Sequence, residues 1–172
     1  MAVATHLSPV RPSLTDGASM WRLTEQTQGI DLNSPYHYLL WCRDFAETTR
    51  VIHNPEGDVV AFTTAYVRPD EPTTLMIWQQ VVSTDYRGRN LGHTMVRELT
   101  RNLLEQQAIT HVEATVTDTT GAPVRTLQKI ADEFGGTLSV ETLFDQTLFP
   151  EGNHEAESLV RIGPLNLTGE SS

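Results

Sequence analysis

Four side chains that carry hydrogen-bonding oxygens stand close together early in the chain. They are Asp31, Asn33, Tyr36 and Tyr38. Carboxylate, amide and phenol oxygens can all accept hydrogen bonds, and together they suit a site for a small polar cation. A local interpretation is also open, because Ser34 and Pro35 are typical of a helix cap with proline in the first turn, and the tyrosines would then be core residues. An Asn/Ser cap of this kind does not account for an acid, an amide and two phenols within eight residues, so the cation-site hypothesis is retained.

A second charged group, His154, Glu155 and Glu157, lies near the C-terminal end of the chain. A metal site is disfavoured here, since there are three close ligands and no identified fourth. If residues 154–160 are extended, Glu155 and Glu157 point to the same side of a strand. The simpler alternative is a solvated pair of charges.

The third segment is the turn at residues 87–92, Arg-Gly-Arg-Asn-Leu-Gly, between an expected strand and an expected helix. The first backbone N–H groups of a helix are unpaired and lie at the positive end of its dipole, so a turn that contains glycine lets a phosphate approach them. The turn matches neither the Walker P-loop nor the dinucleotide-binding fingerprint. On its own it could also be an ordinary helix cap.

The periodicity of apolar residues predicts the elements that position these segments. Helices are expected over residues 16–28, 35–45 and 124–134, and from about residue 92, with Leu91, Met95, Leu99 and Leu103 on one face. Strands are expected over residues 49–53, 58–66, 74–82, 112–116, 138–143 and 158–162. Gly135 and Gly136 are expected to stop the last helix. The order predicts a mixed α/β fold.

Length and composition limit the class of protein. At 172 residues, a single globular domain over residues 10–166 is expected, with residues 1–9 and 167–172 as disordered tails. The net charge of −10 disfavours a nucleic-acid-binding protein. No apolar run suits a bilayer or a signal peptide, so no membrane association and a cytoplasmic location are expected. The single cysteine, Cys42, has apolar neighbours and is expected to be a buried residue, not a nucleophile.

Residues 87–92 resemble the Gln/Arg-x-x-Gly-x-Gly/Ala motif with which the GNAT acetyltransferase superfamily binds the pyrophosphate of acetyl-CoA. The expected element order is similar to that fold, which implies an α/β (α+β) domain with a central mixed, mostly antiparallel sheet of about six to seven strands flanked by about four helices. Residues 31–40, Trp78-Gln79, 152–157 and 161–165 further resemble one member family, the diaminobutyrate acetyltransferases of ectoine biosynthesis. The resemblance spans residues 10–166.

This resemblance implies that acetyl passes from acetyl-CoA to the side-chain (4-) amine of L-2,4-diaminobutyrate by direct attack in a ternary complex, giving N4-acetyl-2,4-diaminobutyrate. It implies substrate contacts at Asp31, Asn33, Tyr36, Tyr38, Trp78, His154 and Glu157, with Glu157 also as the catalytic base. It implies cofactor contacts at Arg87, Gly88, Arg89, Asn90, Leu91, Gly92 and Thr120, and at the backbone of Gln80, Val81 and Val82, where amides would stabilise an oxyanion. A homodimer is also implied, and no metal is expected.

Three positions depart from the superfamily pattern. Asn90 replaces the central glycine of the motif, although asparagine tolerates a left-handed backbone better than other non-glycine residues. Leu127 stands near the position of the tyrosine that often protonates the leaving thiolate, and Thr120 replaces a usual asparagine. The general acid is therefore unassigned, with Tyr38, water or solvent as candidates. Two alternatives remain: an acetyltransferase of another small diamine, and a non-catalytic GNAT module that binds acetyl-CoA.

Overall fold

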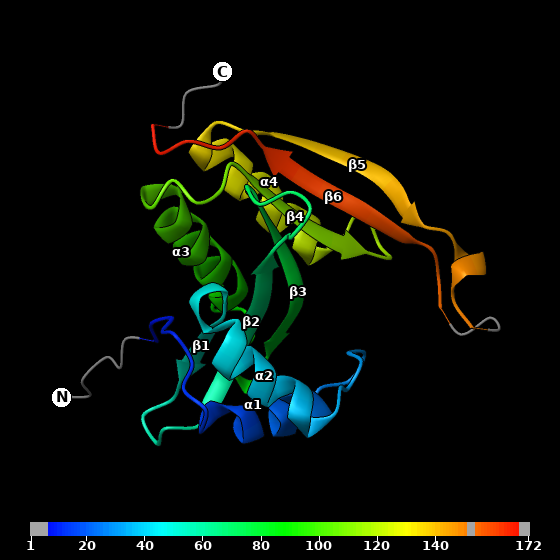
Figure 1. Cartoon of the computed structure of the whole chain (residues 1–172). Coiled ribbons are helices and arrows are strands. Elements are labelled where there is room, and N and C mark those ends of the chain that lie inside the picture. The colour runs from blue at the N-terminus through cyan, green and yellow to red at the C-terminus, as the bar shows by residue number, and fades with distance from the viewer. Residues whose placement is uncertain (1–6, 151–153, 169–172) are drawn as a thin grey trace. The chain divides into compact units, whose positions relative to one another are not determined.

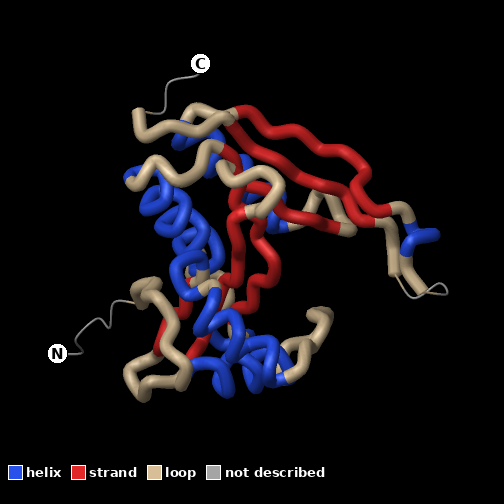
Figure 2. The backbone as a smooth tube through the Cα atoms, viewed as in Figure 1, coloured by secondary structure: helices blue, strands red, loops and turns tan. Residues whose placement is uncertain are grey.

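The computed structural model describes residues 7–150 and 154–168. Gly152, Asn153 and most of the two expected tails lie outside the described residues. Within them, the elements follow the expected order (Figures 1 and 2). The α-helices are α1 (Asp16–Glu25), α2 (Pro35–Asp44), α3 (Leu91–Glu105) and α4 (Ala122–Phe134). The strands are β1 (Arg50–His53), β2 (Val59–Val67), β3 (Thr74–Val82), β4 (His111–Val116), β5 (Thr137–Phe144) and β6 (Glu157–Gly163). Short 3-10 turns, η1 (Ala46–Thr48), η2 (Thr84–Tyr86) and η3 (Gln146–Leu148), connect them.

The described strands form a six-stranded sheet in the order β1-β2-β3-β4-β6-β5. Its β3–β4 pair is parallel, from Thr74 with His111 to Ile77 with Ala114, and α3 provides the crossover that a parallel pair requires. The β1–β2, β4–β6 and β5–β6 pairs are antiparallel. This confirms the mixed, mostly antiparallel sheet expected from the sequence. In the described part of the chain, every helix is too short or too polar to cross a lipid bilayer.

Helix ends follow local hydrogen bonds. The first helix, α1, ends three residues before the expected limit at residue 28, because the Thr27 N–H donates to the Thr24 carbonyl at 3.0 Å and tightens the last turn. The expected stop of α4 is confirmed: Gly135 has a φ of +76°, and the Gly136 N–H donates to the Ala131 carbonyl at 2.9 Å.

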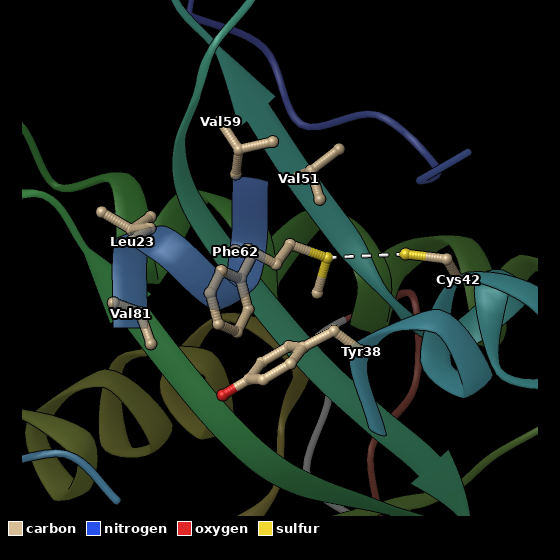
Figure 3. Packing of buried hydrophobic residues seen from close by; sticks show 8 residues of the cluster. Leu23, Tyr38, Cys42, Val51, Val59, Phe62 and Val81 are labelled. Atoms are coloured by element: carbon tan, nitrogen blue, oxygen red, sulfur yellow. Dashed lines mark hydrogen bonds between the residues drawn. The ribbon is translucent and has the colours of Figure 1, made fainter. Parts of the chain in front are cut away.

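The chain divides into two compact units, Met1–Tyr66 with Gln79–Leu99 and Val67–Trp78 with Thr100–Ser172. In the first unit, α1 and α2 lie side by side and pack on the first strands (Figure 1). Figure 3 shows the core between these helices and the strands. It is formed by Met20, Leu23, Tyr38, Cys42, Val51, Val59, Phe62 and Val81. The Tyr38 and Phe62 rings meet edge to face with centroids 6.0 Å apart, so Tyr38 is anchored by aromatic packing.

Cys42 belongs to this core, as expected. Its thiol points to the Met20 sulfur at 3.6 Å (Figure 3). Burial, with a smaller effect of Asp16, raises the pKa of the Cys42 thiol to about 11. The thiol therefore stays protonated at neutral pH, which makes it a poor nucleophile.

The second unit contains a cluster of ion pairs around a buried acid. Glu113 on β4 is 1% exposed and lies opposite Arg161 on β6, with which it forms an ion pair. Arg68 donates to Glu113 at 3.1 Å, and Arg161 donates to Glu71 at 2.5 Å. The hydrogen bond from Arg161 holds the pKa of the Glu71 carboxyl down at about 2. These pairs explain how the unit accommodates a carboxylate in its interior.

Candidate active site

The turn between β3 and α3 contains two residues with a left-handed backbone. Gly88 has a φ of +75° and Asn90 a φ of +62°. The prediction that Asn90 can take a left-handed backbone conformation in this turn is confirmed. The Asn90 carbonyl accepts from both the N–H and the hydroxyl of Thr94, each at 3.0 Å, and so begins the helix.

The start of α3 has the features of an anion site. Because the Thr94 N–H makes the first bond of the helical ladder, the N–H groups of Leu91, Gly92 and His93 precede that ladder. Arg87 and Arg89 are exposed in the same turn. Backbone donors, the helix dipole and two guanidinium groups together suit a pyrophosphate.

Gly92 is needed for close packing against the strand. A Cβ at this position would lie 2.7 Å from the side-chain oxygen of Gln80. The Gln80 amide is held in place, since its NH₂ group donates to the Thr63 hydroxyl at 2.7 Å and to the Gly92 carbonyl at 3.1 Å. The end of β3 and the first turn of α3 are thereby fixed to each other.

Residues 31–38 separate into exposed and buried groups. Asp31 is exposed and Tyr36 is 66% exposed, whereas Tyr38 is fully buried. The Tyr38 hydroxyl donates to the Gln79 side-chain oxygen at 3.2 Å, and the Gln79 NH₂ group donates to the Asp31 carbonyl at 2.8 Å. Ser34 caps α2 by accepting from the His37 N–H at 3.4 Å. The expected cap is therefore present, and of the two tyrosines only Tyr38 is a core residue.

His154 and Glu157 lie together in the second unit. The Nδ1 atom of His154 is 2.8 Å from the Glu155 carbonyl, and its Nε2 atom is 3.6 Å from a carboxylate oxygen of Glu157. The His154 ring stacks on Phe149, with centroids 4.2 Å apart and an angle of 16°. Phe149 was not expected at the site, because nothing in the local sequence pattern links it to a histidine across the loop. The strand begins only at Glu157, so Glu155 lies before β6 and is exposed.

The remaining expected residues have varied surroundings. Trp78 is half exposed and lies in the middle of β3, not at its end as expected, and Asn33 is half-buried. Thr120 donates to the Asp118 carboxylate through both its N–H, at 2.8 Å, and its hydroxyl, at 2.6 Å. Leu127 is buried in α4.

Two further observations concern alternative sites. A polar cavity of about 350 Å³ in the first unit is bordered by Arg22, Asn54, Asp58 and Ser83, and by none of the residues expected to bind substrate or cofactor. Across residues 7–150 and 154–168, no three His, Cys, Asp or Glu side chains are arranged to hold a metal ion.

The comparisons with known proteins agree with the fold. The model of the Acetyltransferase (GNAT) family matches residues 18–130, which defines the class of the protein. A ribosomal-protein-S18-alanine N-acetyltransferase from Escherichia coli shares the fold, with a TM-score of 0.63 over 96% of this chain and 97% of that one, at 14% identity.

More similar relatives define the family within this class. The L-2,4-diaminobutyric acid acetyltransferase of Streptomyces coelicolor is 45% identical over 92% of this chain and 94% of its own length. The relative of the same name from Virgibacillus pantothenticus is 37% identical over 90% and 96%. The diaminobutyrate acetyltransferase EctA from Paenibacillus lautus, solved in complex with L-2,4-diaminobutyric acid and coenzyme A, has a TM-score of 0.82 and 33% identity over 91% and 93%. The chain belongs to the family of L-2,4-diaminobutyric acid acetyltransferases.

Proposed function

We propose that this protein transfers the acetyl group of acetyl-CoA to the side-chain amine of L-2,4-diaminobutyrate, which gives N4-acetyl-2,4-diaminobutyrate for ectoine biosynthesis. The observation that carries the proposal is the similarity over nine-tenths of both chains to an enzyme solved with this substrate and coenzyme A. The residues described above fit the reaction.

The turn at residues 87–92 fits the diphosphate of the cofactor. Its backbone donors and its arginines supply positive potential, and Gly92 places no side chain at the second position of α3. Gln80, Val81 and Val82 lie beyond Ile77, the last β3 residue in the register with β4. We assign the backbone amides of these three residues to the pantetheine arm and to the oxyanion that forms when the thioester is attacked. Thr120 is assigned to acetyl-CoA as well.

His154 and Glu157 fit an amine. The Glu155 carbonyl can only accept a hydrogen bond, so Nδ1 of His154 carries the proton, and in the neutral ring Nε2 has its lone pair toward Glu157. A substrate ammonium beside them can donate to both acceptors. Glu157 then takes a proton from the ammonium, the freed lone pair forms the N–C bond, and the C–S bond breaks. The nitrogen then loses its second proton to water, and the leaving thiolate takes a proton from water, since Leu127 offers none.

The remaining substrate contacts are assigned by the charge and size of the ligand. We assign the Asp31 carboxylate to a cation of the amino acid, and Asn33, Tyr36 and Trp78 each to a further contact with the substrate, as the family resemblance implies. We further propose that residues 10–166 act as a single domain and that the protein is a cytoplasmic homodimer. Light scattering of the purified protein tests the dimer.

A thiol-release assay with acetyl-CoA and L-2,4-diaminobutyrate tests the proposed function. We expect saturable release of coenzyme A and a product that carries acetyl on N4. NMR of the product would identify the acetylated nitrogen. Ornithine and a polyamine in the same assay measure selectivity. The absence of turnover with diaminobutyrate together with turnover of another diamine would overturn the substrate assignment.

A further inference from the structure

The Gln79 side chain, which has no role in the reaction described above, is held at both ends within the first unit. Its oxygen accepts from the Tyr38 hydroxyl at 3.2 Å, and its NH₂ group donates to the Asp31 carbonyl at 2.8 Å. Its backbone is fixed as well: the Gln79 N–H donates to the Thr64 hydroxyl at 3.1 Å, and that hydroxyl donates to the Gln79 carbonyl at 3.2 Å. The side chain therefore links β3 and α2 to the loop before α2.

The hydrogen bonds of Gln79 with Tyr38 and Asp31 allow only one assignment of donors and acceptors. A backbone carbonyl only accepts, so the Gln79 NH₂ group must face Asp31 and the amide oxygen must face Tyr38. An amide oxygen also only accepts, so the Tyr38 hydroxyl is the donor. The Tyr38 proton is thus directed to Gln79, and Tyr38 is buried behind it against Phe62.

The loop that receives this hydrogen bond is exposed at several positions. Gln28, Gly29, Asp31 and Leu32 are all exposed, and Ile30 packs against the core of the unit. The bond from Gln79 ends on the backbone of Asp31, the residue whose carboxylate is proposed to pair with a substrate cation. Fixing this carbonyl also restricts where that carboxylate can lie.

We propose that Gln79 is a positioning residue: held by Tyr38 and Thr64, it places the Asp31 carboxylate for recognition of the substrate cation. The inference rests on the proposed function only in taking Asp31 as a substrate contact. Gln79 takes no part in proton transfer. Its loss therefore changes the affinity for the amine and leaves the chemical step and the cofactor site in place.

The test compares Gln79→Leu, Tyr38→Phe and Asp31→Asn in steady-state kinetics with both substrates varied. Gln79→Leu should raise the KM for diaminobutyrate roughly tenfold, the effect of one lost hydrogen bond to a placed group, with kcat and the KM for acetyl-CoA within about twofold of the parent. Tyr38→Phe keeps the bond to Asp31 and should raise the same KM by less. Gln128→Leu is the matched control, since Gln128 makes a side-chain bond to Asp132 on the exposed face of α4.

A double-mutant cycle separates positioning from general destabilisation. If Gln79 acts through Asp31, the effects of Gln79→Leu and Asp31→Asn on the KM for the amine should be clearly less than multiplicative. Multiplicative effects, or equal losses in both KM values and in kcat, would overturn the inference. If Gln79→Leu fails to fold, the cycle is run with Tyr38→Phe in its place. A KM for diaminobutyrate in Tyr38→Phe equal to that of the parent would then contradict the inference. If the parent acetylates a different amine, the proposed function fails, but the same cycle with that amine still tests Gln79.

Discussion

The Nε2 atom of His154 lies 3.6 Å from a carboxylate oxygen of Glu157, and the other ring nitrogen donates to the backbone. With the imidazole neutral, Nε2 and the Glu157 carboxylate are two hydrogen-bond acceptors that lie close together. A cationic amine can satisfy both, and removal of either acceptor should therefore affect the reaction in a defined way.

Glu157→Gln keeps the shape of the side chain and removes its basicity. We expect kcat/KM for diaminobutyrate to fall roughly a hundredfold or more, because the ammonium keeps its proton. Coenzyme A should bind with unchanged affinity in calorimetry. Glu155→Gln, which changes an exposed neighbour, is the control and should keep the parent rate. A Glu157→Gln variant with near-parent activity would assign the proton to another acceptor.

Phe149→Ala removes the ring on which His154 stacks. Because an aromatic pair contributes modestly to placing its partner, the KM for diaminobutyrate should rise roughly two- to tenfold. Phe149→Tyr retains the ring face and should behave like the parent. Equal kinetics for the alanine and tyrosine variants would show that the stack does not orient His154.

Gly92→Ala places a methyl group against the Gln80 amide. The turn must shift to accommodate it, so the KM for acetyl-CoA should rise roughly tenfold while the KM for the amine changes little. Gly57→Ala is the contrasting control: unlike Gly92, which is helical, Gly57 has a positive φ, of +91°, and its Cβ would meet open space. It should lower the melting temperature without changing either KM. A normal KM for acetyl-CoA in Gly92→Ala would contradict the packing argument.

Cys42 should resist alkylation in the folded protein. With a pKa of about 11, the buried thiol stays protonated at pH 8.5, and iodoacetamide should label it only after unfolding. Linkage gives a second test. The unfolded thiol ionises near 9.0 and the folded thiol near 11, so the unfolded state loses its proton first and the free energy of unfolding falls as the pH rises through this window. Cys42→Ala should lose this part of the pH dependence, and rapid labelling of the native protein would refute the assignment.

Glu113→Gln leaves Arg68 and Arg161 without the buried charge that they share. We expect the free energy of unfolding in urea to fall by about 3 kcal/mol, as for a broken buried ion pair. Glu133→Gln, at an exposed pair with Arg101, should cost less than about 1 kcal/mol. If the two variants lose similar stability, the buried cluster is not a special stabilising feature of this unit.

The elements could be predicted from the sequence because their signals are local. The four apolar positions on α3, the two glycines after α4 and the alternating residues of β4 each act within a few residues, and all three are confirmed. The left-handed Asn90 was also predictable, since it depends on backbone sterics alone.

The contacts made by residues 31–38, Gln79 and Phe149 were harder to predict from the sequence. Residues two apart on a helix do not share a face, so once residues 35–44 are helical, Tyr36 and Tyr38 must point apart; the sequence alone did not decide which one is buried. Gln79 meets partners 41 and 48 positions away in the sequence, and Phe149 meets His154 across a loop. Such contacts follow from tertiary packing and have no period in the sequence.

Asparagine in the left-handed turn before α3 has a consequence for the empty state of the protein. A glycine at this position would explore many backbone conformations whenever the phosphate is absent, whereas Asn90 has few alternatives to the one observed. The chain thus accepts a small steric penalty in exchange for a lower entropy of the unliganded turn. For the diphosphate site proposed here, this means a preorganised backbone, so less of the binding free energy is lost in ordering the loop.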